Sequence, residues 1–247
     1  MKFICTLLCL SLCTLTFAQD NTFSLKASDG DILITPIQHA TMMISYRDLN
    51  IVTDPTGGVE AFEGLSKPNL ILITDIHGDH MNKETLTAMG AKDIQIVAPQ
   101  AVADQLGEEF GDILILGNGE SKELLGINIE ALPMYNLPED ESSRHTKGRG
   151  NGYVLTIGGK RVYVSGDTED IVEMRELKKI DLAFVCMNLP YTMDVDAAAD
   201  ATLDFLPNIV IPYHYRGKGG LSDIQKFKAT VNEGSQKVNV VLLDWYK

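Results

Sequence analysis

The sequence predicts a single-domain α/β protein in which layered β-sheets are covered by helices. Three observations lead to this fold class. The 247 residues are 45% hydrophobic with a mean hydropathy near zero, which suits one large domain with a sizeable core. Short β-type runs dominate the first part of the chain, whereas strands and helices alternate later. No low-complexity linker or solenoid-type repeat divides residues 19–247.

Hydrophobic periodicity and turn residues predict the individual elements. A continuous apolar run at residues 69–74 is typical of a strand buried on both faces. The other expected strands cover residues 22–26, 32–37, 41–46, 50–53, 94–98, 113–116, 127–132, 153–157, 161–165, 182–186, 208–212 and 238–243. The expected helices cover residues 82–89, a segment after Pro99, and residues 171–178, 197–206 and 223–233.

Residues 1–18 have the features of a secretory signal peptide. Lys2 supplies a positive charge, residues 3–15 form a short apolar run, and a small-residue cleavage motif follows. Because the run is too short for a membrane span, we expect an exported protein, periplasmic or secreted, without a stable membrane anchor. A lipid attached to Cys13 is one alternative, although bulky Leu12 makes a poor recognition site. A buried N-terminal helix is another.

Cysteine content and charge limit how the protein is held together and what it binds. Cys186 is the one cysteine in residues 19–247, so we expect no internal disulfide and interpret this thiol as a small buried hydrophobe. The formal net charge is −13. Such an acidic chain repels phosphate backbones, so no nucleic-acid partner is expected, and an anionic substrate would need a local basic patch.

A cluster of metal-ligand side chains follows the apolar strand at residues 69–74. Asp75, His77, Asp79 and His80 fall within six residues there. Imidazole and carboxylate are natural ligands for zinc and similar divalent ions. Without a cation, the two carboxylates would raise each other's pKa. The pattern therefore favours a metal site over the alternative, a polar loop in which Asp79 caps the following helix.

This stretch, Asp-x-His-x-Asp-His, resembles the metallo-β-lactamase superfamily motif His-x-His-x-Asp-His, with Asp75 in the place of the first histidine. The resemblance continues in the family's order. His145 precedes a Gly-Tyr strand, Asp167 lies in Ser-Gly-Asp-Thr, and His214 follows a late strand. The match covers nearly all of residues 19–247. It implies a four-layer αββα sandwich with the metals at the open edge of the sheets.

The resemblance also implies two divalent ions and their ligands. The expected ligands are Asp75, His77 and His145 for the first ion, Asp79, His80 and His214 for the second, and Asp167 between the two. Zinc is the first expectation, while the oxygen ligand Asp75 makes manganese an alternative. A hydroxide between the ions would attack an ester, lactone or phosphodiester, with Asp79 and Asp167 as the catalytic carboxylates.

Two further signatures resemble the branch of ascorbate-6-phosphate lactonase-like hydrolases, and N-acylphosphatidylethanolamine phospholipase D enzymes share some of the same features. One is Gln-His-Ala-Thr around His39 with Thr-Asp-Pro around Asp54, and the other is Tyr-Thr-Met starting at Tyr191. Asp54 is a candidate for fixing a ligand histidine, although a strand-end turn with Pro55 explains it almost as well. His39 lies outside the family's ligand set and could contact substrate or satisfy a core hydrogen bond.

Basic and aromatic residues near the expected ligands indicate the substrate class. The loops around His145 and His214 are rich in Lys and Arg, although the chain has 34 acidic and only 21 basic residues. This predicts an anion-binding rim for a small molecule, with a solvated loop as the alternative. Arg149, Lys218 and Tyr215 lie in the same loops. The candidate substrate-binding residues are His39, Arg144, Lys147, Asn151, Tyr191, Tyr213 and Arg216.

Three other functions share some of these features. A mononuclear iron dioxygenase of the persulfide-oxidising kind has the same fold, but the expected ligand set with His80 and His214 argues against it. A non-catalytic metal-binding protein would need a decayed site, whereas only Asp75 departs from the motif. A true β-lactamase suits export, but Asp75 and the lactonase-like signatures point away from it. The sequence leaves substrate, metal and oligomeric state open.

Overall fold

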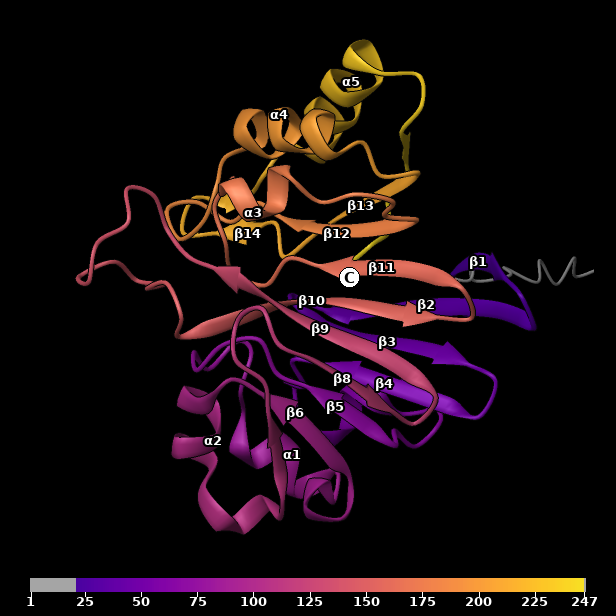
Figure 1. The fold of residues 1–247 in the computed structure, drawn as a ribbon, viewed down its shortest axis with the longest axis vertical. Coiled ribbons are helices and arrows are strands. Elements are labelled where there is room, and N and C mark those ends of the chain that lie inside the picture. The colour runs from indigo at the N-terminus through magenta and orange to yellow at the C-terminus, as the bar shows by residue number, and fades with distance from the viewer. Residues whose placement is uncertain (1–20, 247) are drawn as a thin grey trace, which may run out of the picture.

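The structure, a computed structural model, describes residues 21–246. The predicted signal peptide, residues 1–18, lies outside the described residues. Two seven-stranded sheets pack against each other, and helices cover both outer faces, so the predicted αββα sandwich is confirmed (Figure 1). Within residues 21–246, no helix is both long and apolar enough to cross a membrane.

The first sheet contains seven strands in chain order. Strands β1 to β4 are antiparallel neighbours, and β4 to β7 are parallel neighbours. Its strands are β1 (Phe23–Ala27), β2 (Gly30–Gln38), β3 (Thr41–Tyr46), β4 (Leu49–Thr53), β5 (Leu70–Leu72), β6 (Gln95–Ala98) and β7 (Ile113–Ile115).

The second sheet repeats this plan with the second half of the chain. Strands β8 to β11 are antiparallel neighbours, and β11, β12, β13 and β16 are parallel neighbours. Its strands are β8 (Ser121–Leu124), β9 (Ile127–Met134), β10 (Gly150–Ile157), β11 (Lys160–Val164), β12 (Leu182–Cys186), β13 (Ile209–Tyr213) and β16 (Asn239–Val240). A small hairpin, β14 (Arg216–Gly217) with β15 (Gly220–Leu221), follows β13.

The helices lie on the two outside faces, with α1 and α2 beside the first sheet and α4 and α5 beside the second (Figure 1). Asn82, rather than Asp79, caps α1, because its side chain accepts from the backbone N–H of Thr85 at 2.8 Å. The helices are α1 (Lys83–Ala88), α2 (Gln100–Leu106), α3 (Val172–Arg175), α4 (Val195–Phe205) and α5 (Ile224–Gly234), with short 3-10 turns η1 (Val59–Phe62), η2 (Ala91–Asp93) and η3 (Gly107–Phe110).

Alternating side chains of the central strands explain why this layering is stable. In β5, Leu70 and Leu72 face the core between the sheets, while Ile71 packs with the residues beneath α1 and α2. Successive strand residues point to opposite faces, so a strand covered on both sides is apolar throughout. Full burial of each such side chain contributes roughly 1.5–3 kcal/mol. Cys186 is buried as predicted, which raises the pKa of its thiol to about 12.

Several predicted boundaries differ from the observed ones. The expected helix at residues 171–178 is only the single turn α3, and the expected strand at residues 238–243 is reduced to β16. The polar strand β8 and the hairpin β14–β15 were not predicted. β8 contains one apolar residue and lies at the sheet edge, where exposed polar side chains give no hydrophobic pattern.

Candidate metal centre

The predicted ligands come together at one edge of the sandwich. Each lies after a strand: the segment from Asp75 to His80 follows β5, Asp167 follows β11, His214 follows β13, and His145 lies in the long loop between β9 and β10. Carboxyl ends of parallel strands meet at the same edge of a sheet, so loops from both halves of the chain converge. Three groups of potential ligand atoms result, each with its atoms within 4.8 Å of one another: Asp75, His77 and His145; His80, Asp167 and His214; and His39, Asp79 and His214.

The first group is built around the buried carboxylate of Asp75. Its Oδ2 contacts Nδ1 of His77 and lies 3.9 Å from Nε2 of His145. Burial would raise the pKa of Asp75, but the hydrogen bond with His77 and the nearby charges of His80, His77 and Arg149 lower the pKa to about 2. Asp75 is therefore an anion at the position where the superfamily motif has a neutral imidazole.

Arg149 supplies a cation for this unusual carboxylate. One of its guanidinium nitrogens lies 3.3 Å from Oδ1 of Asp75, and the same nitrogen donates to the backbone carbonyl of Arg144 at 2.5 Å. An isolated buried carboxylate is costly, and a charge-assisted hydrogen bond offsets much of that cost. Arg149, placed by the sequence among the basic loop residues, thus pairs with Asp75 and still leaves Oδ2 directed at the histidines.

The second group is buried, and its Asp167 lies between the two histidines of this group and His145 of the first group. Its Oδ2 lies 3.3 Å from Nε2 of His80 and 3.3 Å from Nε2 of His145, and its Oδ1 lies 3.1 Å from Nε2 of His214. Burial raises the pKa of Asp167, yet His214, His80 and His145 together hold the pKa well below its ordinary value. One carboxylate therefore contacts histidines of both the first and the second group.

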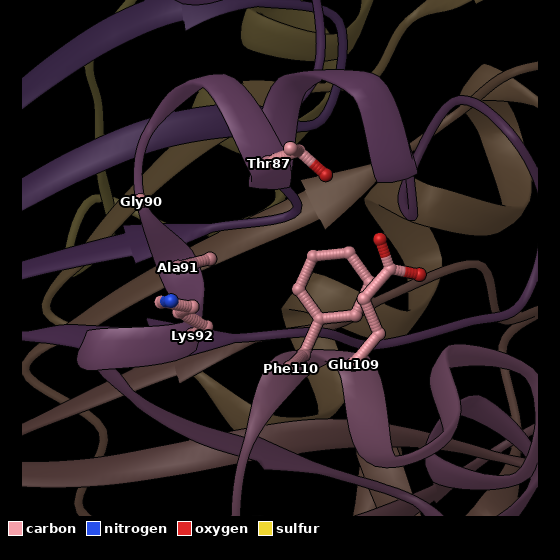
Figure 2. A pocket seen from close by; sticks show the side chains of 6 residues that line it. All are labelled: Thr87, Gly90, Ala91, Lys92, Glu109 and Phe110. Atoms are coloured by element: carbon pink, nitrogen blue, oxygen red, sulfur yellow. The ribbon is translucent and has the colours of Figure 1, made fainter.

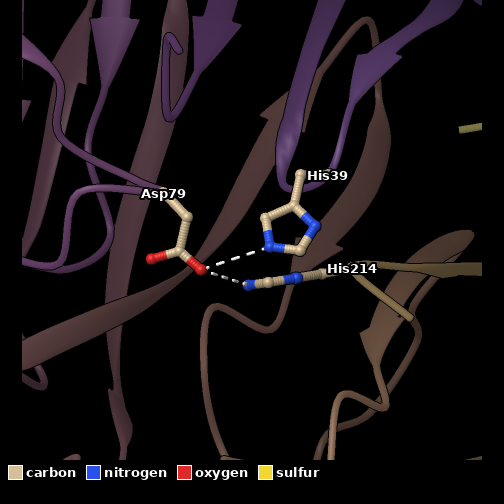
Figure 3. Close-up of side chains that lie close together, drawn as sticks. All are labelled: His39, Asp79 and His214. Atoms are coloured by element: carbon tan, nitrogen blue, oxygen red, sulfur yellow. Dashed lines mark hydrogen bonds and ion pairs between the residues drawn. The ribbon is translucent and has the colours of Figure 1, made fainter. Parts of the chain in front are cut away.

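Asp79 and His39 form the exposed end of the centre (Figure 3). Oδ2 of Asp79 lies 3.2 Å from Nε2 of His39 and 3.6 Å from Nε2 of His214. The side chain of Asp79 is 38% exposed, in contrast to the buried Asp75 and Asp167. The sequence placed His39 outside the ligand set, whereas the structure brings its ring to a predicted ligand.

Asp54 holds one of the predicted ligands in place. Its Oδ2 lies 2.9 Å from Nδ1 of His80 and also accepts from the hydroxyl of Thr74 at 2.7 Å. The structure thus shows the expected contact of Asp54 with a histidine of the predicted ligand set. Two asparagines that the sequence analysis did not single out contact other predicted ligands: Oδ1 of Asn136 accepts from the backbone N–H of His145, and Nδ2 of Asn188 lies 3.3 Å from Nε2 of His214.

The backbone at the centre is held in a sparsely populated conformation. His39, Asp54 and His214 have φ values of 53°, 46° and 46°, in the left-handed region that residues with a Cβ rarely adopt. Such conformations cost of order 1–3 kcal/mol each and persist at functional sites where the surroundings impose them. All three side chains point at the same few predicted ligands, so the strain is concentrated where the geometry of the site is set.

Unpaired polar atoms show that these residues fit a cation. Both ring nitrogens of His145 and Oδ1 of Asp167 are buried but make no well-formed hydrogen bond. Buried polar atoms are normally paired, so atoms left over in such a cluster need another partner. Imidazole nitrogens and carboxylate oxygens at this spacing match the ligands that zinc and similar ions take.

The structure corrects two of the predicted substrate residues. Tyr213 is fully buried in β13, and its hydroxyl accepts from the backbone N–H of Gly166 at 2.9 Å. Asn151 is fully buried in β10, where its side chain donates to the carbonyl of Leu116 and contacts Asn118. Both side chains brace the strands beneath the ligands, because these strands are covered on both faces. Tyr215, which follows His214 in the sequence, is also buried.

The basic residues of the predicted rim differ in whether a carboxylate is already paired with them. Lys147 lies 3.0 Å from Glu173 and above the ring of Tyr135, so it already has acidic and aromatic partners. Arg144 stacks on Tyr191 with 4.6 Å between guanidinium carbon and ring centroid, and Arg216 stacks on Tyr246 at 4.1 Å. Neither arginine has a carboxylate partner among residues 21–246, so both are available to an anion.

Two hollows lie at different places on the fold. One, of about 420 Å³, borders the centre and is lined by residues that include His39, Asp79 and Arg216. Another, of about 280 Å³, lies between α1 and η3 and is lined by residues that include Lys92 and Phe110 (Figure 2). None of the predicted ligands lines the second hollow, so only the first one is placed to admit a substrate.

A family model and similar proteins of known sequence agree on one superfamily for this chain. The family described as a beta-lactamase superfamily domain matches residues 14–214. The chain is 31% identical over 206 residues to a UPF0173 metal-dependent hydrolase of Pyrococcus abyssi, which spans 78% of this chain and 88% of that protein. A UPF0173 metal-dependent hydrolase of Thermococcus onnurineus is 32% identical over 183 residues, 71% of this chain and 78% of the other.

Solved structures show the same fold. The crystal structure of a Parabacteroides distasonis protein, provisionally named a metal-dependent hydrolase, is 36% identical with a TM-score of 0.81 and covers 91% of this chain and 99% of that chain. A metallo hydrolase from Ignicoccus hospitalis has a TM-score of 0.73 at 22% identity, covering 87% and 95% of the two chains. At that identity the likeness concerns the fold alone.

Proposed function

The chain belongs to the beta-lactamase superfamily, and from this membership and the geometry of its centre we propose that it is a metal-dependent hydrolase that uses two divalent ions. One observation carries the proposal of two ions: the carboxylate of Asp167 lies within 3.3 Å of histidine nitrogens from both the first and the second group. A carboxylate in that position is suited to bridge two cations.

The chain's own residues would divide between the ions as follows. Asp75, His77 and His145 would hold the first ion, and Asp79, His80 and His214 the second, with Asp167 shared. Asp54 would keep the ring of His80 in the orientation that leaves Nε2 free, because Asp54 occupies its Nδ1. Zinc fits this donor set, and the oxygen donors also fit manganese.

The chemistry follows from what such ions supply. When bound, they lower the pKa of a water molecule from about 15.7 towards about 7 and polarise the group that is attacked. The carboxylate of Asp79, at the exposed end of the centre, would accept a hydrogen bond from that water. The buried side chains of His80, Asp167 and His214 exclude bulk solvent behind the reacting group.

The substrate we propose is a small anionic molecule with an ester, lactone or phosphodiester. The unpaired guanidinium groups of Arg144 and Arg216 support an anion, and the acidic character of the whole chain argues against nucleic acid. The proposal includes the placement of this chain near the ascorbate-6-phosphate lactonase branch, which rests on the sequence signatures around His39, Asp54 and Tyr191. We also propose export after removal of residues 1–18, on the sequence features given above.

Elemental analysis of protein purified without chelator, combined with a substrate panel, tests this function. The expected result is two divalent ions per chain and turnover of at least one ester, lactone or phosphodiester that a chelator abolishes. Iron with oxygen uptake would instead indicate a dioxygenase. Bound metal without any turnover would indicate a non-catalytic protein, and hydrolysis of nitrocefin a β-lactamase.

A further inference from the structure

The hollow beside Asp79 has the features of a binding subsite next to the metal centre. It measures about 420 Å³ and is lined by residues that include Gln38, Thr56, Asn82, Arg216 and Tyr246. Resting on the proposed function, we infer that this hollow is the subsite for a carboxylate group of the substrate, bound by Arg216 and organised by Tyr246.

Arg216 is the free charge of this hollow. Asp79, the only acidic residue among the described residues that line it, is directed at His39 and His214 (Figure 3). No carboxylate lies within ion-pair distance of Arg216 among residues 21–246, whereas Lys147 and Arg149 are paired with acids. In a chain of net charge −13, a guanidinium without an acidic partner at the mouth of the site is the group that an anion would meet.

Tyr246 holds Arg216 in position. The guanidinium carbon lies 4.1 Å from the ring centroid of Tyr246, and the tyrosine hydroxyl accepts from the backbone N–H of Arg216 at 3.1 Å. The same hydroxyl lies 2.9 Å from Nδ1 of His39, whose Nε2 faces Asp79. When the ring proton of His39 is on Nε2, the hydroxyl of Tyr246 donates to Nδ1. Each polar group between Arg216 and Asp79 then has a hydrogen-bond partner.

The charge of the subsite favours a monoanion. One guanidinium presents a planar fork that matches a carboxylate and balances a single negative charge. A dianionic phosphate would leave one charge uncompensated close to Asp79. The other polar side chains of the hollow are amides and a hydroxyl, and part of their hydrogen bonding is internal, since Gln38 donates to Thr56 at 3.1 Å. These observations favour a carboxylate over a phosphate.

Three p-nitrophenyl esters that differ only at the far end of the acyl chain provide the test: valerate, hemiglutarate and 4-phosphonobutyrate. With the zinc-loaded protein, the KM for the hemiglutarate should be the lowest. Arg216→Gln should raise that KM about tenfold and change the KM for the valerate less than twofold. Lys92→Gln is the matched control, because it removes one positive charge at the remote hollow of Figure 2.

Variants of the other aromatic and basic residues separate the alternatives. Tyr246→Leu should raise the KM for the hemiglutarate about two- to fivefold, because Arg216 loses its stacking partner. An equal effect of Arg216→Gln on valerate and hemiglutarate would overturn the subsite. If Arg144→Gln raised the KM for the hemiglutarate more than Arg216→Gln does, the anion would bind at Arg144 instead, and the subsite at Arg216 would also be overturned. An Arg216-dependent preference for the phosphonate would overturn the assignment of a carboxylate.

Binding measured without turnover keeps this inference distinct from the proposed function. Calorimetry with the p-nitroanilides of glutarate and valerate should show tighter binding of the glutarate compound to the wild type and loss of that difference in Arg216→Gln. If no ester is hydrolysed but this difference is present, the proposed hydrolysis fails and the subsite stands. If the wild type binds both anilides equally, the subsite fails whatever the esters show.

Discussion

The two sides of the metal centre are held by different means. On the side of His80 and His214, the imidazoles are fully buried, and Asp54 and Thr74 fix the ring of His80 from behind. On the side of Asp75, a carboxylate replaces an imidazole, His77 is 23% exposed, and Arg149 reaches in from the loop between β9 and β10. The first arrangement depends on fully buried side chains that are fixed by hydrogen bonds, and the second on an ion pair with a cation from a neighbouring loop.

This difference indicates that the two proposed ions are not equivalent. A carboxylate brings one more negative charge and a harder donor atom than an imidazole, so it favours ions that prefer oxygen ligands. Arg149 withdraws part of that charge by pairing with the oxygen of Asp75 that faces away from the histidines. The ion on the Asp75 side should therefore exchange more easily and be less selective than the ion beside His80. The predictions below test this contrast.

The largest effect is expected from Asp167, which belongs to both sides. Asp167→Ala should remove bound metal and reduce turnover by at least about 10²-fold, because both ions lose a ligand. Metal content by elemental analysis and turnover of any substrate found on the panel measure this, with circular dichroism as the control for folding. Full activity in a folded Asp167→Ala variant would contradict the two-ion proposal and, with it, the contrast between the two sides of the centre.

Substitution of Asp75 should affect one side only. Asp75→Ala should remove about one metal per chain, whereas Asp75→His should keep two and shift the pH–rate profile towards acid, because an ion with less negative charge around it lowers the pKa of the attacking water further. Metal analysis and a pH series of kcat measure both effects. Unchanged metal content and an unchanged profile in Asp75→Ala would mean that Asp75 does not bind metal.

Asp54→Asn tests the other side. Loss of the carboxylate that fixes His80 should weaken metal binding there by about 10–100-fold, while the ion on the Asp75 side is retained. Competition with a chelator resolves the two sites as a weak and a tight fraction. Arg149→Gln is the matched variant on the opposite side, where loss of the guanidinium that withdraws charge from Asp75 should tighten metal binding. The contrast between the sides would be wrong if both variants weakened the same fraction.

The smallest effect is expected from Lys147. The structure pairs it with Glu173 and stacks it on Tyr135, so Lys147→Ala should change the KM for an anionic ester by less than about twofold. Partly exposed ion pairs of this kind contribute only about 0–1 kcal/mol, so thermal unfolding should barely change. A clear rise of KM for anionic but not neutral esters would show that the side of His145 also binds the substrate's charge.

Local patterns in the sequence predicted much of the fold and the positions of the ligand-type residues. Buried strands and the Asp-x-His-x-Asp-His stretch can be predicted from the sequence, because the residues that form each of them are neighbours both in the chain and in space. The contact of Arg149 with Asp75 joins residues 74 positions apart, so no local sequence pattern predicts it. Tyr213 and Asn151 were misplaced because the loops and the buried strands on either side of them are adjacent in sequence, and only the packing decides which side chains point outward.

Each of the two seven-stranded sheets is formed by one continuous half of the chain, and the link between them is the short segment 116–120. The halves have matching strand order, and Asp54 after β4 occupies the place in the first half that Asp167 after β11 occupies in the second. The ligands are shared between the halves, so neither fragment alone contains a complete site. A cut in the linking segment would interrupt no strand of either sheet, and metal uptake would then report the reassociation of the two fragments, as in a split reporter.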